Sequence, residues 1–142
     1  MELEIGQVLW LNVRYQTDVI SSIPHPMLVA ITNIEENYIE VIAIDKAKNK
    51  IHQLFSEANF YLDSENPKES VILVDSYAQL NNKLTIEYFP ELIRFRKNKN
   101  KLSDEKLIPL IESYKEYHSK NFIPDKRIVH MTKREILELN PN

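Results

Sequence analysis

Short apolar runs separated by polar turns occupy the first two thirds of the chain. The run at residues 7–15 (QVLWLNVRY) has a composition typical of a β-strand. Its apolar positions on one face are Leu9, Leu11, Val13 and Tyr15. Two further runs, at residues 27–32 and 38–45, flank the polar sequence NIEEN. Short length, β-branched residues and turn-forming ends predict a strand at each of these three places.

The strand pattern continues to about residue 88. The sequence KAKN predicts a second hairpin turn, with residues 50–55 pairing back. Residues 56–69 form a polar connection in which we expect one helical turn at EANF. The most apolar short run, residues 70–75 (SVILVD), predicts a central strand. Residues 84–88 (LTIEY) predict the last strand, which Pro90 ends.

The pattern then changes to helical spacing. Ser103 is a suitable N-cap, and acidic residues follow it in the first turn. The apolar stripe of this helix is Leu107, Leu110, Ile111 and Tyr114. Pro109 lies too deep for a regular first turn and predicts a kink or a restart. Thr132 and Glu135 form a capping box and predict a second helix over residues 133–139.

Five or six short strands, a helix and a small helical tail indicate one fold class. We expect a mainly β protein with C-terminal helices, built as a small antiparallel barrel of SH3-like or OB-like size. A length of 142 residues suits one domain.

The composition narrows the function classes. The chain has one glycine, Gly6, so a glycine-rich phosphate loop is excluded. Asparagine must then supply the positive backbone φ that tight turns require. There is no cysteine, which excludes thiolate chemistry. No apolar run approaches the length of a membrane span, and the N-terminus is unlike a signal peptide, so we expect a cytoplasmic protein.

The net charge of −3 is unevenly distributed. Residues 1–75 carry 12 acids and 5 bases, whereas residues 76–142 carry 9 acids and 13 bases. An anionic partner would therefore meet the second half of the chain.

Several segments, taken in order, resemble the MazF/PemK toxin family. EIGQVLWLNV is similar to the family's opening strand, HPMLVAITN to its second strand and YIEVIAID to its third. NPKESVILVDSYAQL resembles its fifth strand and the following turn, and KLSDEKLIPLIESY its C-terminal helix. The resemblance covers residues 5–118, and residues 119–142 are interpreted as an extension.

The resemblance implies an SH3-like barrel domain over residues 1–118 with a closing helix, followed by a C-terminal extension over residues 119–142 with a short helix. It implies a homodimer that cuts single-stranded RNA as an endoribonuclease, without metal or cofactor, and that a cognate antitoxin protein restrains. Such cleavage needs a base for the 2′-hydroxyl, an acid for the leaving 5′-oxygen and cations around the phosphorane.

The chain departs from the family pattern at catalytic positions. His25 replaces the arginine of Arg-Pro, Ala78 replaces a second arginine, and Asn81 stands where an aspartate is common. The family's Ser/Thr after the third strand falls near Asp45 or Lys46. Two interpretations stay open: a divergent nuclease with rebuilt catalysis, or a degenerate SH3-like module that binds RNA or a protein partner.

Three residues are candidates for catalysis. His25 stands between two prolines, which fix its backbone on both sides, and an imidazole can act as acid or base near neutral pH. Asp45 would lie opposite position 25 or 26 if the second and third strands pair. Arg14 could hold a phosphate through a bidentate pair. The structural alternatives are an exposed histidine at a rigid strand entry, a polar strand end and a surface salt bridge.

The basic segment RFRKNKNK, residues 94–101, is the candidate for RNA contact. Its bases can follow the phosphate backbone while an aromatic ring stacks on a nucleobase. The residues assigned to RNA binding are Arg94, Phe95, Arg96, Lys97 and, on a neighbouring strand, His52. The same alternation also suits an edge strand kept soluble by lysines. His118 and His130 lack partners at ligand spacing, so we expect no metal site.

Overall fold

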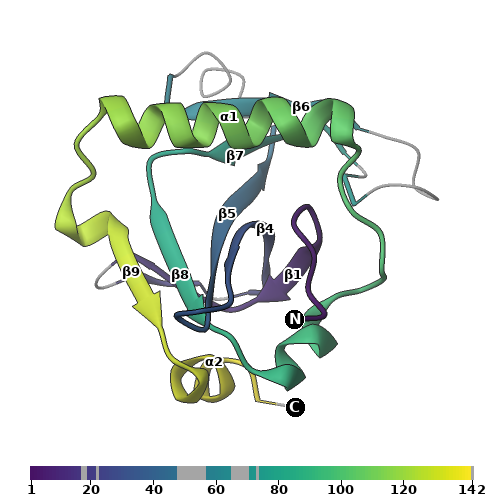
Figure 1. Ribbon diagram of the computed structural model, residues 1–142, viewed down its shortest axis with the longest axis vertical. Helices are drawn as coiled ribbons and strands as arrows, with labels where there is room; N and C mark the ends of the chain where they lie inside the picture. The colour runs from purple at the N-terminus through teal and green to yellow at the C-terminus, as the bar shows by residue number, and fades with distance from the viewer. Residues whose placement is uncertain (17–18, 22, 48–56, 65–70, 73, 142) are drawn as a thin grey trace.

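The computed structural model describes residues 1–16, 19–21, 23–47, 57–64, 71–72 and 74–141. The described strands are β1 (Val8–Leu11), β2 (Arg14–Gln16), β3 (Val19–Ile20), β4 (His25–Asn33), β5 (Tyr38–Lys46), β6 (Asn59–Leu62), β7 (Ser76–Gln79), β8 (Lys83–Glu87) and β9 (Ile128–Met131). The helices are α1 (Asp104–Lys120) and α2 (Lys133–Leu139), with short 3₁₀ segments η2 (Pro90–Phe95) and η3 (Asp125–Arg127). The expected mainly β protein with C-terminal helices is therefore confirmed (Figure 1).

Seven of the described strands form one sheet, whose path runs β1-β4-β5-β7-β6. Strand β5 pairs with β4 on one edge. On its other edge it pairs first with β8 and then with β7. Strand β9 joins β8 in parallel, and the other pairs of this sheet are antiparallel. The described strands do not close on one another, so the finer expectation of a barrel stays a prediction.

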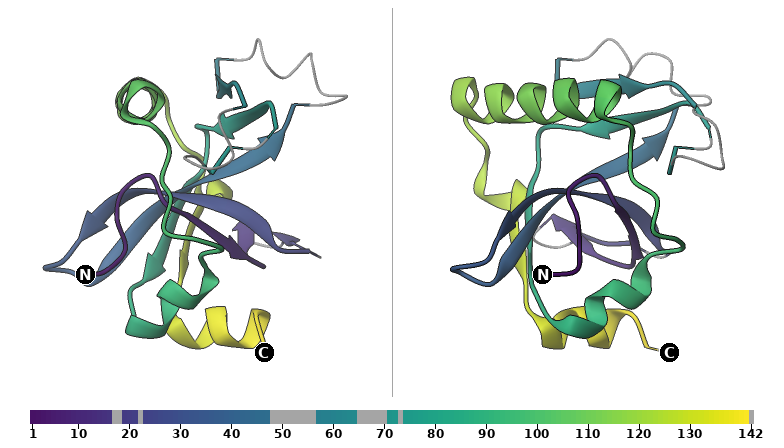
Figure 2. Two further views of the ribbon diagram at one scale, coloured as in Figure 1. Left: turned by 90° about the vertical axis from the view of Figure 1, so that its right-hand side faces the viewer. Right: turned by 45° about the vertical axis from the view of Figure 1, so that its right-hand side comes forward.

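Both faces of the sheet are covered, which explains the nearly continuous apolar runs of β4 and β5. On β4, Met27 and Val29 enter a core with η2, β9 and α2, which we call the α2-side core. Leu28 and Ala30 enter a second core beneath α1, which we call the α1-side core. Figure 2 shows α1 and α2 on opposite sides of the strands.

The early strands agree with the sequence pattern. Residues 27–32 and 38–45 lie in strands, as predicted, and so do residues 84–87 of the strand predicted at 84–88, while Tyr88 lies just outside β8. The turn between β4 and β5 uses Asn37 at a φ of 59°, so an asparagine supplies the positive φ expected in a chain poor in glycine.

The expected first strand is shorter than predicted, because the chain leaves β1 at Asn12. There the backbone N–H of Asn12 donates to Oδ1 of Asn140 over 2.7 Å, and Nδ2 of Asn140 donates to the Asn12 carbonyl over 2.9 Å. These bonds replace the sheet pairing that a continuous strand would make at this residue.

Two predictions for the middle of the chain are wrong. EANF does not form a helical turn: its last two residues begin β6, which pairs with β7. The described residues of the run 70–75 are not in a strand, and the strand in this part of the chain is Ser76–Gln79, which pairs with both β5 and β6. Ile72 is buried in the α1-side core although no strand holds it. The strand expected at residues 50–55 lies outside the described residues.

The C-terminal third packs into the same structure. Helix α1 runs through Pro109 without interruption, so the predicted restart is wrong. Its predicted apolar stripe packs into the α1-side core. Helix α2 has the predicted bounds, and the Glu135 N–H donates to Oγ1 of Thr132 over 3.2 Å. Residues 119–141 add β9 to the sheet and bury Met131 and Ile136.

Among the described residues, no helix combines the length and the apolar character that crossing a membrane would require.

A small cluster of polar side chains lies where α1 covers the sheet. The Tyr114 side chain is buried beside the Glu40 carboxylate, and both burial and that carboxylate raise the pKa of the phenol. The His118 ring lies 4.1 Å from the Tyr114 ring, and its Nε2 lies 2.8 Å from the Leu80 carbonyl. Burial is the main cause of the lowered pKa of His118, and the nearby charge of Lys83 lowers it further. The Leu80 carbonyl and Glu40 act in the opposite direction.

This lowered pKa predicts acid sensitivity of the α1 contact. Below about pH 6.5 the unfolded chain takes up a proton at His118 that the folded chain resists, so the free energy of unfolding falls as pH falls. Between pH 7.5 and pH 5, the free energy of unfolding measured in urea should fall less in His118→Gln than in the wild type. The control His130→Gln, at an exposed ring, should keep the wild-type loss. Equal losses in His118→Gln and the wild type would contradict this origin.

Gly6 is required where the N-terminal turn meets α1. Its φ is +96°, and a Cβ there would lie 2.9 Å from Cδ2 of Leu107 and 3.3 Å from Cβ of Lys101. Gly6→Ala should therefore lower the free energy of unfolding by about 1–3 kcal/mol, measured by urea denaturation. The control Glu4→Ala, at an exposed side chain of the same turn, should change it by less than about 0.5 kcal/mol. An unchanged midpoint in Gly6→Ala would contradict the assignment.

Candidate functional site

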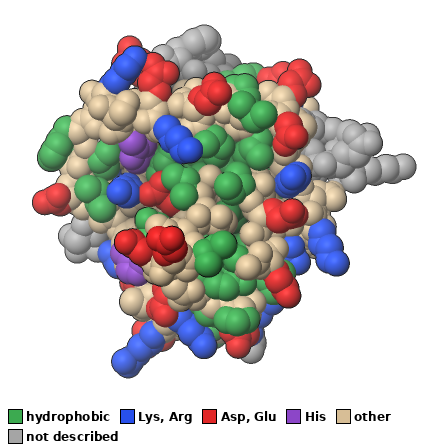
Figure 3. Space-filling view, in the orientation of Figure 1, with side chains coloured by type: hydrophobic (Ala, Val, Ile, Leu, Met, Phe, Trp, Pro, Cys, Tyr) green, Lys and Arg blue, Asp and Glu red, His purple; other side chains and the backbone are tan. Residues whose placement is uncertain are grey.

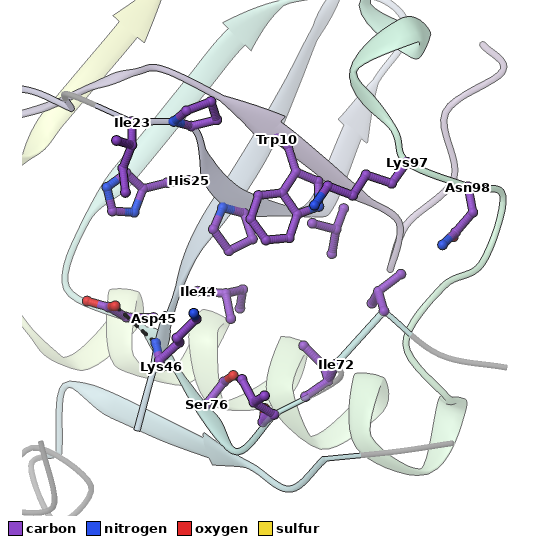
Figure 4. Close-up of a pocket in the computed structure, with 15 residues that line it drawn as sticks. Trp10, Ile23, His25, Ile44, Asp45, Lys46, Ile72, Ser76, Lys97 and Asn98 are labelled. Atoms are coloured by element: carbon purple, nitrogen blue, oxygen red, sulfur yellow. Dashed lines mark hydrogen bonds between the residues drawn. The ribbon is translucent and has the colours of Figure 1, made fainter. Parts of the chain in front are cut away.

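A pocket of about 630 Å³ opens where β4 and β5 part (Figure 4). Its polar lining residues are His25, Asp45, Lys46, Ser76, Lys97 and Asn98. Its apolar lining includes Trp10, Ile23, Pro26, Ile44, Ile72 and Val74. Thus His25 and Asp45, predicted for catalysis, share a pocket with Lys97, predicted for RNA contact.

The pairing of β4 with β5 explains why His25 and Asp45 meet at the pocket. A bulge between Val29 and Ile31 shifts the register by one residue. The ladder ends at Met27 and Ala43, and two more steps in that register would set Asp45 opposite His25. Instead β5 turns to pair with β7 from Ile44 onward. The two residues therefore lie on diverging strands, at the same side of the opening between them (Figure 4).

Trp10 and Lys97 form the other side of the pocket. Trp10 is half-buried and lies beside Pro26 of the neighbouring strand. The Lys97 ammonium lies 3.9 Å from the centre of its ring, within cation–π range. Figure 4 shows His25 and Asp45 on one side of the pocket, with Trp10, Lys97 and Asn98 across it.

Hydrogen bonds to Gln7 fix the backbone that carries Lys97. Gln7 is 1% exposed, and its Nε2 donates to the Lys99 carbonyl over 3.1 Å. Nη1 of Arg96 donates to Oε1 of Gln7 over 3.2 Å. Arg96 also forms an isolated β-bridge with Leu9. Lys97 follows directly and is thereby held over the strand that contains Trp10.

The Asp45 carboxylate already has hydrogen-bond donors. Oδ1 accepts from the Lys46 backbone N–H over 3.0 Å, and Oδ2 accepts from the Tyr77 hydroxyl over 3.1 Å. These contacts tie the end of β5 to β7. They orient the carboxylate at the edge of the pocket.

Three other residues predicted to bind RNA, Arg94, Phe95 and Arg96, make contacts within the protein. Phe95 packs against the α2-side core, and the Arg94 guanidinium lies 4.9 Å from the centre of its ring. Arg96 bonds Gln7, as described above. Neither Phe95 nor Arg96 lines the pocket, and Phe95 has the core rather than a nucleobase as its partner. His52 lies outside the described residues.

Arg14 is not brought to the pocket. Its Nε and Nη2 donate to the two carboxylate oxygens of Glu135 over 2.8 and 3.0 Å, and Nη2 also donates to the His130 carbonyl. The salt bridge that the sequence left as an alternative is therefore present, and it joins β2 to α2. The Glu135 carboxylate thus accepts hydrogen bonds from Arg14. In a complete capping box it would accept from the backbone N–H of Thr132 instead.

We expect this ion pair to affect stability. Its side chains are 24% and 29% exposed, so Arg14→Gln should lower the free energy of unfolding by about 1 kcal/mol in urea denaturation. Because Glu135→Gln removes the same contact, the double variant should cost less than the two single variants added together. The control Arg134→Gln breaks a far more exposed pair and should cost a few tenths of a kcal/mol. Additive single costs would contradict the pairing.

Sequence reasoning missed Trp10 and assigned no role to Ser76 or Asn98. A signal for Trp10 was present, because it alternates with Leu9 and Leu11 and so must lie on the opposite face of β1. Nothing in the sequence shows that residues 97–98 lie beside β1, since hydrogen bonds of a buried glutamine bring them there.

The distribution of charge can be followed on one face of the molecule. On the face in Figure 3, acidic and basic side chains are interspersed. The excess of bases in the second half of the chain therefore does not produce a basic patch on this face. The basic groups relevant to an anion are Lys46 and Lys97 at the pocket.

Among the described residues, no three His, Cys, Asp or Glu side chains lie close enough to hold a metal ion. Comparison of the chain with protein-family models, with curated proteins and with solved structures found no match.

Proposed function

We propose that the chain is a divergent endoribonuclease of the MazF/PemK type that cleaves single-stranded RNA at the pocket between β4 and β5. The observation that supports this most is one pocket lined by an imidazole, a carboxylate, two ammonium groups and an indole. These are the group types needed for proton transfer, phosphate binding and base stacking.

In this proposal Asp45 takes the proton of the 2′-hydroxyl. The 2′-oxygen then attacks phosphorus, the bond from phosphorus to the 5′-oxygen breaks, and His25 gives its proton to that leaving oxygen. The products are a 2′,3′-cyclic phosphate and a 5′-hydroxyl, so atoms and charge balance. Figure 4 shows both residues on the same side of the pocket, where an extended strand could present these two oxygens.

Lys46 and Lys97 replace the family's arginines in this proposal. Both side chains are exposed and line the pocket. An ammonium group stabilises the developing phosphorane charge as a point charge, without the bidentate geometry of a guanidinium. We therefore expect slower cleavage than an arginine-based site would give.

The same resemblance carries the remaining parts of the proposal. They are a small SH3-like barrel, a homodimer and a cognate antitoxin that blocks the pocket, and the cytoplasmic location expected from the sequence is proposed with them. The bend of β5 from β8 to β7 supports the barrel, because a small barrel needs strands that are shared between two sheets.

A second candidate function is RNA binding without cleavage. It is favoured by Asp45, whose two oxygens already accept hydrogen bonds from Lys46 and Tyr77, as in a purely structural carboxylate. Among the described residues no arginine lines the pocket, which also favours binding over catalysis.

The cleavage proposal predicts the effect of removing the imidazole. His25→Gln should lower the cleavage rate of a labelled single-stranded RNA by about 10²–10⁴-fold, because it removes a general acid. Asp45→Asn should lower the rate similarly. Cleavage by the wild type should persist in EDTA, since no step uses a metal.

The control for this experiment is His130→Gln, at an exposed histidine that does not line the pocket. It should cleave at the wild-type rate. Undiminished cleavage by His25→Gln would remove the imidazole from the mechanism. Filter binding of RNA with no cleavage by any form of the protein would favour the second candidate.

A further inference from the structure

The indole that we assign to base stacking is covered in the free protein. The Lys97 ammonium lies 3.9 Å from the centre of the Trp10 ring, over one of its faces, and both residues line the pocket. A base and this ammonium cannot occupy the same ring face. RNA binding at the pocket therefore requires Lys97 to leave the indole.

The two partners differ in how firmly they are held. Trp10 belongs to β1, is half-buried, and packs against the α1-side core. Lys97 has an exposed side chain on a backbone that Gln7 and Arg96 anchor. A long exposed lysine can change rotamer while its backbone stays in place, whereas the indole cannot turn without disturbing the core.

From this geometry we infer that Trp10 is the stacking platform for one unpaired base, and that Lys97 exchanges its cation–π contact for the adjacent phosphate when the strand binds. Lys97 then covers the indole in the free protein and binds a phosphate of the strand in the complex. This inference rests on the proposed function, because it assigns the ligand of the same pocket.

The exchange is favourable in physical terms. An exposed cation–π contact is weaker than stacking of a base on an indole, so the base displaces the ammonium. The displaced ammonium stays within reach of the strand and neutralises a phosphate, which releases counterions. Lys97 therefore lowers access to the indole in the free protein without lowering the final affinity.

The chain contains a single tryptophan, so its intrinsic fluorescence reports on Trp10 alone. The probe is a ten-nucleotide oligothymidylate, which has bases but no 2′-hydroxyl and so cannot be cleaved by the proposed chemistry. The comparison strand is an abasic deoxyribose phosphate of the same length and charge. Oligothymidylate should quench Trp10 emission and protect it from acrylamide, and the abasic strand should do neither.

Two variants test the two partners separately. Trp10→Leu, which removes the aromatic face and keeps an apolar side chain, should weaken binding of oligothymidylate by about 5- to 100-fold and should leave the abasic strand unaffected. Lys97→Ala should increase acrylamide quenching of free Trp10. It should also lower the slope of log affinity against log salt by about 0.7 for the oligothymidylate. The matched control Lys99→Ala, at an exposed lysine that does not line the pocket, should leave acrylamide quenching unchanged.

The outcomes separate this inference from cleavage itself. Quenching by oligothymidylate without cleavage of RNA would overturn the nuclease and leave the stacking platform. RNA cleavage with no change in Trp10 emission, or equal affinity for the two strands, would overturn the platform alone. An unchanged salt slope in Lys97→Ala would overturn the exchange. Failure of the protein to bind or cleave any strand would overturn both proposals.

Discussion

The pocket depends on how β5 divides its hydrogen bonds between neighbouring strands. On one edge it pairs with β4 as far as Ala43. On the other edge it pairs with β8 through residues 38–41 and with β7 through residues 44–46. A strand that changes partners must bend away from its first neighbours, and β4 cannot follow. The space between the diverging ends of β4 and β5 is the pocket.

A second constraint comes from one buried side chain near the N-terminus. Gln7 and the adjacent Gly6 bond across to Val29 of β4, and Leu102 donates to the Gly6 carbonyl. The side chain of Gln7 also accepts from Arg96 and donates to the Lys99 carbonyl. This connects β4, the N-terminal turn and the basic segment. The ammonium over Trp10 is a consequence, because Lys97 lies between the two anchored residues.

The sequence predicted well those elements whose periodicity is local. Strands β4, β5 and β8 and helix α2 follow from alternation, turn asparagines and a capping box, each of which acts within a few residues. The sequence did not predict β7, because we expected a strand at the more apolar run SVILVD and the strand is formed by Ser76–Gln79. Hydropathy reports burial, and Ile72 is indeed buried, but strand formation there depends on pairing with β5 and β6.

The candidate site could be predicted only in part for a similar reason. His25 and Asp45 were linked because hairpin geometry is local, and only the bulge after Val29 remained unknown. Lys97 was chosen for its charge, yet its neighbours Phe95 and Arg96 were chosen on the same grounds and serve the core and Gln7 instead. A basic sequence does not say which side chain is free to meet a ligand, since that depends on contacts with segments about 90 residues away.

The arrangement of the lining residues constrains the kind of nucleic acid that the pocket could accept. Trp10 lies on the face of the sheet toward α1, whereas Asp45 follows the alternation of Ala43, whose side chain enters the α2-side core. A ligand that reached both must present its base in one direction and its sugar–phosphate in another. The bases of a double helix are stacked and paired, so they cannot reach an indole inside a pocket. An extended strand with one base turned out can do so, and the function that we propose is therefore restricted to single strands.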